Sequence, residues 1–248
     1  MFIYLLLTVA LSLQSLISMT SCMPTAATQP PAVSIPILMY HTSSEDNPGY
    51  FTELYIRPSE FRRQIAFLVE NGFTFITFDD FDNLHNIERP VMVTFDDGYL
   101  ENYTEIFPIL QEFNATIVLF LTWSSIRNHG LTEEMLFTMV NSGLVIIESH
   151  TMTHTNLTSL SNKPDRLRFE LYESRRLIEE LTGRRPIALA YPAGRFNQVV
   201  IDMAAGYYSF GVRHDLGMHN TAFCNFEVRR IRISRSTGFN SFVRLIAP

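Results

Sequence analysis

The chain has 248 residues, of which 46% are hydrophobic and 18% charged, and its formal net charge is −6. A chain of this length can bury one large core, and it is ordinarily a single domain when it forms an α/β barrel. The acidic balance argues against a nucleic-acid partner, because such proteins usually concentrate Lys and Arg on one face. We therefore expect one catalytic domain and a neutral substrate.

The N-terminus, residues 1–22, has the pattern of an export signal. The stretch Phe2–Leu13 is almost continuously apolar, yet it is shorter than the ~20 residues of a membrane-spanning helix. The four residues Met-Thr-Ser-Cys that end at Cys22 resemble a bacterial lipobox, whose cysteine becomes lipidated. We expect a lipid anchor on a bacterial membrane, with secretion as the alternative. Residues 23–33 then form a tether, and residues 34–248 form the domain.

From Ser34 onward, short β-branched or aromatic runs alternate with longer stretches of helical period. The runs predict strands over residues 35–40, 73–78, 91–95, 116–121, 144–148, 187–191, 207–212 and 228–233. Apolar residues at helical spacing stop at Gly72, and the longest predicted helix, with residues 167–181 along one side, ends at Gly183. Thr132 can cap a further helix that ends at Gly143. Repeated alternation of strands and helices predicts parallel strands with helices outside them.

Candidate site residues follow four of the predicted strands directly or one residue later. They are His41, the pair Asp96-Asp97, His150, and the string Pro192-Ala193-Gly194. Because the active site of an α/β barrel lies at the carboxyl ends of its strands, these groups should meet on one face. Core packing does not readily explain four such groups at one face.

Asp96, Asp97, His150 and His154 together suit hydrolysis. One carboxylate and two imidazoles can hold a divalent metal and leave positions open for water and substrate, while the second carboxylate accepts a proton. The two histidines have the four-residue spacing of a zincin, but Thr151 stands where a zincin needs Glu. A non-haem iron oxygenase also uses two His and one carboxylate, but there the carboxylate is close to one His. The order of ligands therefore favours a hydrolase.

A second Thr-Phe-Asp-Asp string begins at Thr77. No Gly follows it, so a close turn after the second Asp is not favoured. Paired carboxylates near a helix start commonly act as caps. We expect Asp79 and Asp80 to be capping or surface residues.

The strings at residues 94–99, 149–154 and 191–194 resemble the first three motifs of the polysaccharide deacetylase family, also called carbohydrate esterase family 4 or the NodB-like domain. The opening string at residues 36–41 and the closing string at residues 230–233 are similar to an exported bacterial subgroup with Met-Tyr-His near its start. This resemblance implies a distorted (β/α)7-type barrel in the α/β class. It also implies metal-dependent removal of N-acetyl groups from an amino-sugar polymer.

Matching the motifs residue by residue, the resemblance implies that Asp97, His150 and His154 bind the metal and that Asp96 is the general base. Zinc is the first expectation for the metal, with cobalt or nickel as alternatives. Metal binding would stabilise one of the neighbouring carboxylates as an anion and leave the other free for proton transfer.

Further roles follow from the same resemblance. The backbone N–H of Ala193 can stabilise the oxyanion, and Tyr99 and Pro192 are expected to bind substrate. The acid for the leaving amine is a late-strand His in the family, but the motif order of the subgroup looks permuted. That order points to His41, with His214 as the alternative.

The third motif departs from the family in two places. Ala193 stands where an aromatic residue commonly follows the Pro, and Ala190 stands where many members carry an Arg that steadies the base. Two alternatives therefore remain open beside a deacetylase of envelope or biofilm polysaccharide. One is a deacylase or amidohydrolase of a small amide, and the other is a catalytically silent carbohydrate-binding relative. We infer no obligate protein partner.

Overall fold

A curled parallel sheet forms the centre of the protein in the computed structural model, which describes residues 32–128, 130–214 and 217–247. Strands follow the order β10-β9-β8-β7-β6-β2-β12, and β5 pairs with the start of β6. The strands are β1 (Ser34–Ile35), β2 (Ile37–Tyr40), β3 (Thr42–Ser43), β4 (Tyr55–Ile56), β5 (Thr74–Phe75), β6 (Pro90–Asp97), β7 (Ile117–Leu121), β8 (Val145–Ser149), β9 (Ala188–Ala190), β10 (Phe210–Val212), β11 (His219–Asn220) and β12 (Ile231–Arg232).

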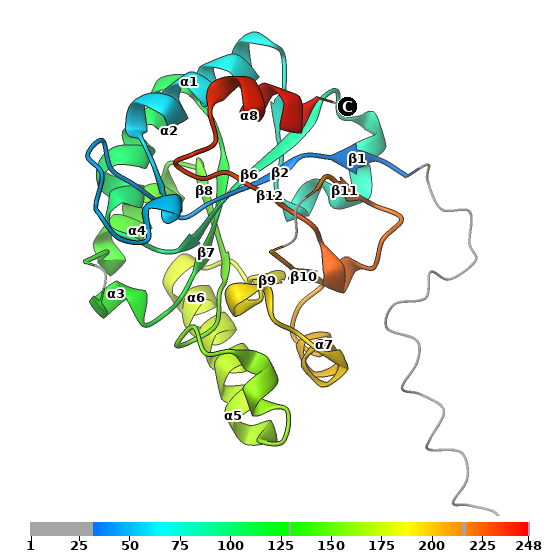
Figure 1. Ribbon diagram of the computed structural model, residues 1–248. Helices are drawn as coiled ribbons and strands as arrows, with labels where there is room; N and C mark the ends of the chain where they lie inside the picture. Colours follow the sequence, from blue (N-terminus) through cyan, green and yellow to red (C-terminus); the bar gives the residue numbers. More distant parts are fainter. Residues whose placement is uncertain (1–31, 129, 215–216, 248) are drawn as a thin grey trace, which may run out of the picture.

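Helices surround this sheet (Figure 1). They are α1 (Pro58–Glu70), α2 (Phe107–Phe113), α3 (Ser125–Asn128), α4 (Glu133–Asn141), α5 (Pro164–Arg168), α6 (Ser174–Thr182), α7 (Gln198–Ala204) and α8 (Phe239–Ile246). Shorter helical segments include η2 (Phe78–Asn86), η3 (Asn102–Ile106), η5 (Phe169–Glu173) and η6 (Pro192–Gly194). Thr132 caps α4 by accepting a hydrogen bond from the backbone of Met135 (3.2 Å), as its sequence pattern predicts.

The two edges of the sheet are joined by the stretch from Val228 to Arg232. Val228 bridges to Val212 at the end of β10, and the N–H of Arg213 donates to its carbonyl (2.9 Å). A few residues later, β12 pairs with β2 in parallel. The sheet thereby curls into an incomplete barrel, and the predicted fold class, a distorted α/β barrel in one domain, is confirmed.

Strand β7 shows why the central strands are apolar throughout. All five of its residues are buried. Leu119 packs in the core beneath the outer helices, whereas Val118 and Phe120 pack in the barrel interior. A strand covered on both faces gains free energy from every side chain that it buries, and this explains the unbroken hydrophobic runs in the sequence.

Two predicted elements are divided in the structure. The strand predicted over residues 35–40 breaks at Pro36, which has no N–H for a ladder; β1 then pairs antiparallel with β11. The longest predicted helix consists of α5, η5 and α6, and its middle segment η5 is π-helical. Apolar spacing alone gives no sign of that wider turn.

The N-terminal predictions concern residues outside the described part of the chain. Residues 1–31, which include Cys22, are not described, so the export signal and the lipid anchor stay predictions. Among the described residues, no helix combines the length and the apolar character needed to cross a membrane.

Candidate active site

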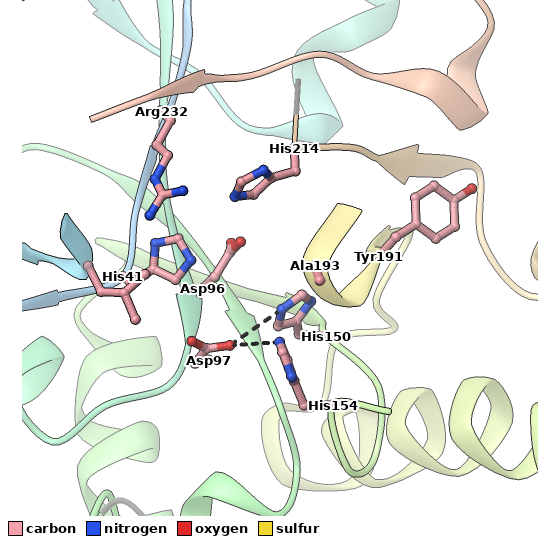
Figure 2. A pocket seen from close by; sticks show the side chains of 10 residues that line it. His41, Asp96, Asp97, His150, His154, Tyr191, Ala193, His214 and Arg232 are labelled. Atoms are coloured by element: carbon pink, nitrogen blue, oxygen red, sulfur yellow. Dashed lines mark ion pairs between the residues drawn. The ribbon is translucent and has the colours of Figure 1, made fainter. Parts of the chain in front are cut away.

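A cavity of about 210 Å³ opens at the carboxyl ends of the strands. It is lined by His41, Leu54, Asp96, Asp97, His150, His154, Tyr191, Ala193, His214 and Arg232. Figure 2 shows the metal-ligand candidates on one side and His41, Arg232 and His214 on the other, with Asp96 between them. The structure thus brings together all four strand-end groups that the sequence singled out.

Asp97 lies between the two imidazoles. Its Oδ1 atom is 3.4 Å from Nε2 of His150 and 3.4 Å from Nε2 of His154. These separations are long for N–H···O hydrogen bonds. They match the ~3.3–3.4 Å between two ligand atoms bound at ~2.0–2.1 Å to one tetrahedral ion. The buried Oδ1 atom also has no hydrogen-bond partner among the described residues, so these three side chains fit a divalent metal.

The charge state of Asp97 also suits a ligand. Burial alone would raise the pKa of its carboxyl, but the His150 imidazole and the nearby charges of His41 and His154 outweigh burial and lower that pKa. The carboxyl is therefore ionised at neutral pH. Metal ligands of this kind must be deprotonated.

His150 is fixed by its other ring nitrogen. Nδ1 lies 2.8 Å from the carbonyl oxygen of Ala190, a contact in which the ring N–H donates. This places the proton on Nδ1 and leaves the Nε2 lone pair facing Asp97. The backbone of Ala190 therefore orients the imidazole, although its side chain is small.

The site backbone is unusual where its motifs turn. Asp97, Thr151, His154 and Ala193 have φ values of 76°, 72°, 58° and 53°. Non-glycine residues in this left-handed region cost on the order of 1–3 kcal/mol each and cluster at functional sites. The side chains of the motifs are aimed by this backbone.

Gly98 shows why the first motif needs glycine. Its φ is +82°, and a Cβ atom there would lie 2.6 Å from Cδ1 of Leu121 and 2.8 Å from Oγ of Ser125. Both the conformation and the space disfavour a side chain here. Glycine therefore lets the chain turn directly after Asp97 without displacing Leu121 or Ser125.

Asp96 is held by Arg230. Nη1 donates to Oδ1 (2.6 Å) and Nη2 donates to Oδ2 (2.7 Å), and both side chains are almost completely buried. Arg230 also donates to Thr94 Oγ1 (3.0 Å) and to the carbonyl of Arg213 (3.1 Å). Burial would raise the pKa of Asp96, but the charge of Arg230 outweighs it and lowers that pKa.

The sequence showed that Ala190 stands where many family members carry an Arg that steadies the base. It did not predict that Arg230 would be the partner of Asp96. The run Val228–Ile233, predicted as a strand, holds three arginines, Arg229, Arg230 and Arg232. An arginine that such a strand buries needs a buried partner, but the sequence does not show that Arg230 is the buried one. Only the pairing of β12 beside β2, and of β2 beside β6, identifies that partner.

Both histidines proposed as the acid line the cavity. Burial lowers the pKa of His41, while Asp96 and Asp97 oppose this effect. His214 lies against Gly194, where an added Cβ would come within 2.3 Å of the His214 Cβ. The glycine of the third motif therefore allows its turn to approach His214.

Arg232 is a lining residue that the sequence did not single out. Its side chain extends from β12 into the cavity near His41 (Figure 2). The side chain is half-buried, and its guanidinium has no hydrogen bond or ion pair with any residue that the structure describes. An oxygen-rich ligand would complete its donors.

The remaining predicted residues lie near the cavity or away from it. Tyr99 is half-buried, and burial together with Asp97 raises the pKa of its hydroxyl. Pro192 is buried in η6, and neither residue lines the cavity.

Asp80 completes a capping box with Thr77, and Asp79 pairs with Arg184, so the capping and surface roles predicted for these two carboxylates are confirmed.

Comparisons with known proteins agree with the motifs. The sequence profile of the Polysaccharide deacetylase family matches residues 83–208. The Bacillus subtilis protein YxkH, which is assigned as a polysaccharide deacetylase, is 30% identical over 222 residues, covering 87% of this chain and 76% of that protein. The poly-β-1,6-N-acetyl-D-glucosamine N-deacetylase of Escherichia coli is 38% identical over 74 residues, which is 28% of this chain and 11% of the enzyme.

A solved structure has the same fold over 87% of this chain, the share that the Bacillus subtilis relative also covers. The crystal structure of a protein from Bacillus anthracis, assigned as a polysaccharide deacetylase, superposes with a TM-score of 0.81 at 28% identity, covering 87% of this chain and 70% of that one. The sequence profile, the Bacillus subtilis relative and the fold all agree. The chain belongs to the polysaccharide deacetylase family.

Proposed function

We propose that this protein is a metal-dependent hydrolase that removes N-acetyl groups from an N-acetylated amino-sugar polymer of the cell envelope or biofilm. The observation that carries the proposal is that Oδ1 of Asp97, which accepts no hydrogen bond from a described residue, lies 3.4 Å from each of two imidazole nitrogens, beside a second carboxylate in one cavity. The Escherichia coli relative named for poly-β-1,6-N-acetyl-D-glucosamine supports the substrate class over its matched segment.

Asp97, His150 and His154 would hold the metal. Two nitrogen ligands and one oxygen ligand suit zinc, and cobalt or nickel would accept the same set. When bound there, such an ion lowers the pKa of a water molecule and polarises the acetamide carbonyl. The protein fixes the ligands beforehand through Ala190, whose carbonyl orients His150.

Asp96 is proposed as the general base. Arg230 engages both carboxylate oxygens, so the carboxylate is ionised and held in one orientation. Each oxygen keeps a further lone pair that can accept a proton from the attacking water. Arg230, directly before β12, would thus perform the steadying role for which the third motif lacks a side chain, and this favours an enzyme over a silent binding relative.

The leaving amine needs a proton when its C–N bond breaks. His41 is proposed as the donor, with His214 as the alternative, because both line the cavity. The N–H of Ala193 is proposed to stabilise the developing oxyanion. Measuring kcat for His41→Ala and His214→Ala separates the two candidates, since only loss of the true acid should slow amine departure.

Arg232 is proposed to bind an oxygen of the substrate or of the released acetate. Its donors have no acceptor among the described residues, and it lies in the cavity. Arg232→Gln should therefore raise KM or weaken acetate inhibition more than it lowers kcat.

The decisive test pairs metal analysis with acetate release from a panel of acetylated glycans. The purified protein should contain about one divalent metal per chain and release acetate from at least one polymer. His150→Ala should lose metal and activity while remaining folded. Full metal occupancy in that variant would refute the ligand set, and acetate release from small amides alone would favour the alternative amidohydrolase.

We also propose that the protein is of the exported subgroup and is anchored through Cys22. The support is the apolar stretch Phe2–Leu13 and the lipobox-like string. Cys22→Ala should move the protein from the membrane fraction to the soluble fraction without changing its activity. Unchanged membrane retention would contradict lipidation at this residue.

A further inference from the structure

Glu170 lies fully buried beneath the turn that connects His150 to His154. Its Oε2 atom accepts the backbone N–H groups of Met152 (3.1 Å) and Thr153 (3.0 Å). Its Oε1 atom accepts the hydroxyl of Thr153 (2.7 Å). One carboxylate from η5 therefore receives three hydrogen bonds from two of the three residues between the histidines.

That turn is not a conformation that its residues would adopt readily on their own. Thr151 and His154 are both left-handed, at φ 72° and 58°. Within the turn, the backbone N–H of His154 donates to the side-chain Oγ1 of Thr151, which accepts this hydrogen bond (3.1 Å). Strained backbone of this kind persists only when its surroundings over-determine it, and Glu170 supplies such a constraint.

A second contact comes from the same helix edge. Ser174 Oγ lies 2.9 Å from Ser149 Oγ, which accepts the N–H of Thr151 (3.2 Å). Ser174 also donates to the carbonyl of Glu170 (2.8 Å). The π-helical segment η5 precedes Ser174 directly, and π-turns are frequent at functional sites. Glu170 thus holds Met152 and Thr153 directly, and Ser174 contacts Ser149, which accepts the N–H of Thr151 at the start of the turn.

The two histidines depend on this turn to different degrees. His150 is buried at the end of β8, and its ring is fixed by the Ala190 carbonyl. The side chain of His154 is 45% exposed, and its backbone belongs to the turn itself. The direction of the His154 imidazole therefore depends on the backbone that Glu170 holds.

We propose that Glu170 is a positioning residue that presets the turn so that Nε2 of His154 faces Asp97, and that it thereby sets the affinity for the metal. This inference rests on the proposed metal site. Partners that orient metal ligands typically change metal affinity 10- to 100-fold when they are removed. Glu170 is not itself a ligand candidate, because its oxygens are occupied by the turn.

The experiment measures Zn²⁺ affinity of the metal-stripped protein by competition with a chromophoric chelator. Glu170→Ala should weaken Zn²⁺ binding about 10- to 100-fold, and excess Zn²⁺ should restore its acetate release. Glu170→Gln should stay within a few-fold of wild type, because its amide oxygen accepts the two N–H groups and its NH₂ donates to Thr153. Glu173→Ala is the matched control, since Glu173 lies in the same segment but pairs with Arg176 at the surface.

A folded Glu170→Ala variant with wild-type Zn²⁺ affinity would overturn the inference. If that variant does not fold, Thr153→Val decides: it removes one donor to Glu170 and should weaken Zn²⁺ binding several-fold, whereas unchanged affinity overturns the inference. Failure of the wild-type protein to bind Zn²⁺ through His150 would instead refute the proposed metal site. The two failures are therefore distinguishable.

Discussion

The chain contains the string Thr-Phe-Asp-Asp twice, at residues 77–80 and 94–97, and the two copies have different structures. In the first copy Thr77 caps η2, and its hydroxyl accepts the N–H of Asp79 (3.3 Å). In the second copy Thr94 lies within β6, where its hydroxyl donates to the carbonyl of Leu38 on the neighbouring strand (2.8 Å). The threonine of the first string therefore begins a helix, whereas the threonine of the second string joins two strands of the sheet by a hydrogen bond.

The first aspartate of each string meets an arginine. Asp79 pairs with Arg184, and these side chains are 54% and 29% exposed. Asp96 pairs with Arg230, and these side chains are 3% and 1% exposed. An exposed ion pair contributes little to stability, whereas breaking a buried one leaves an uncompensated charge. Burial, rather than residue type, separates a surface contact from a site component.

The second aspartates differ in their surroundings and in the residue after them. Asp80 accepts the N–H of Thr77 (2.7 Å) and completes a capping box within its own helix. Asp97 is followed by Gly98, turns away in a left-handed conformation, and meets histidines from a distant strand end. The glycine is the local difference, and the topology of the sheet supplies the remainder of the site.

The largest expected difference is in turnover. Asp96→Asn removes the proposed base and should lower acetate release about 10²- to 10⁴-fold while metal content is unchanged. Asp79→Asn, the same change in the other string, should leave activity intact. Parallel measurement of bound metal and acetate release checks both. If the Asp96→Asn variant kept its activity, Asp96 would not be the base, and the two strings would not differ in catalytic role.

The next effect is on stability. Arg230→Gln leaves Asp96 buried without its cation and should reduce the free energy of unfolding by about 3–5 kcal/mol. Asp79→Asn breaks the exposed pair and should cost about 1 kcal/mol or less. Urea denaturation of both variants measures the difference. Equal losses would show that burial does not separate the two pairs.

Gly98→Ala tests the residue directly after the second string. A Cβ there forces a left-handed alanine, costing ~1 kcal/mol, and clashes with Leu121, adding ~1–3 kcal/mol. Gly72→Ala is the control, because Gly72 also has positive φ (+68°) but open space around its added Cβ. Thermal denaturation should show the larger loss for Gly98→Ala, and identical losses would exclude the clash.

The smallest effect concerns the capping threonine. Thr77→Ala removes the side-chain cap of η2 and should cost ~0.5–2 kcal/mol with no change in metal binding. Urea denaturation and metal analysis of this variant are sufficient to check it. A loss of metal would mean that the first string contributes to the site after all.

The sequence predicted the strands that carry the site because their hydrophobic runs and the glycines after their helices are local signals. It placed Asp96, Asp97, His150 and His154 at strand ends, and the structure brings them into one cavity. Their catalytic and metal-binding roles remain predictions.

Arg230 was not predicted as a partner because it lies 134 residues from Asp96 along the chain, and only the curling of the sheet brings them together. The contacts of Glu170 were hidden for a different reason. They depend on a π-helical turn and on left-handed residues, which leave no periodic trace in the sequence.

The four left-handed residues around the cavity have a consequence for inactivation by heat. At ~1–3 kcal/mol each, Asp97, Thr151, His154 and Ala193 together oppose folding by roughly 4–12 kcal/mol, which is comparable with the ~5–15 kcal/mol net stability of a typical domain. We expect these turns to open locally on warming, which would release that strain while the apolar strands beneath them stay packed. Acetate release should therefore be lost on warming before the barrel unfolds. The midpoint temperature for loss of activity should lie below the midpoint temperature for unfolding.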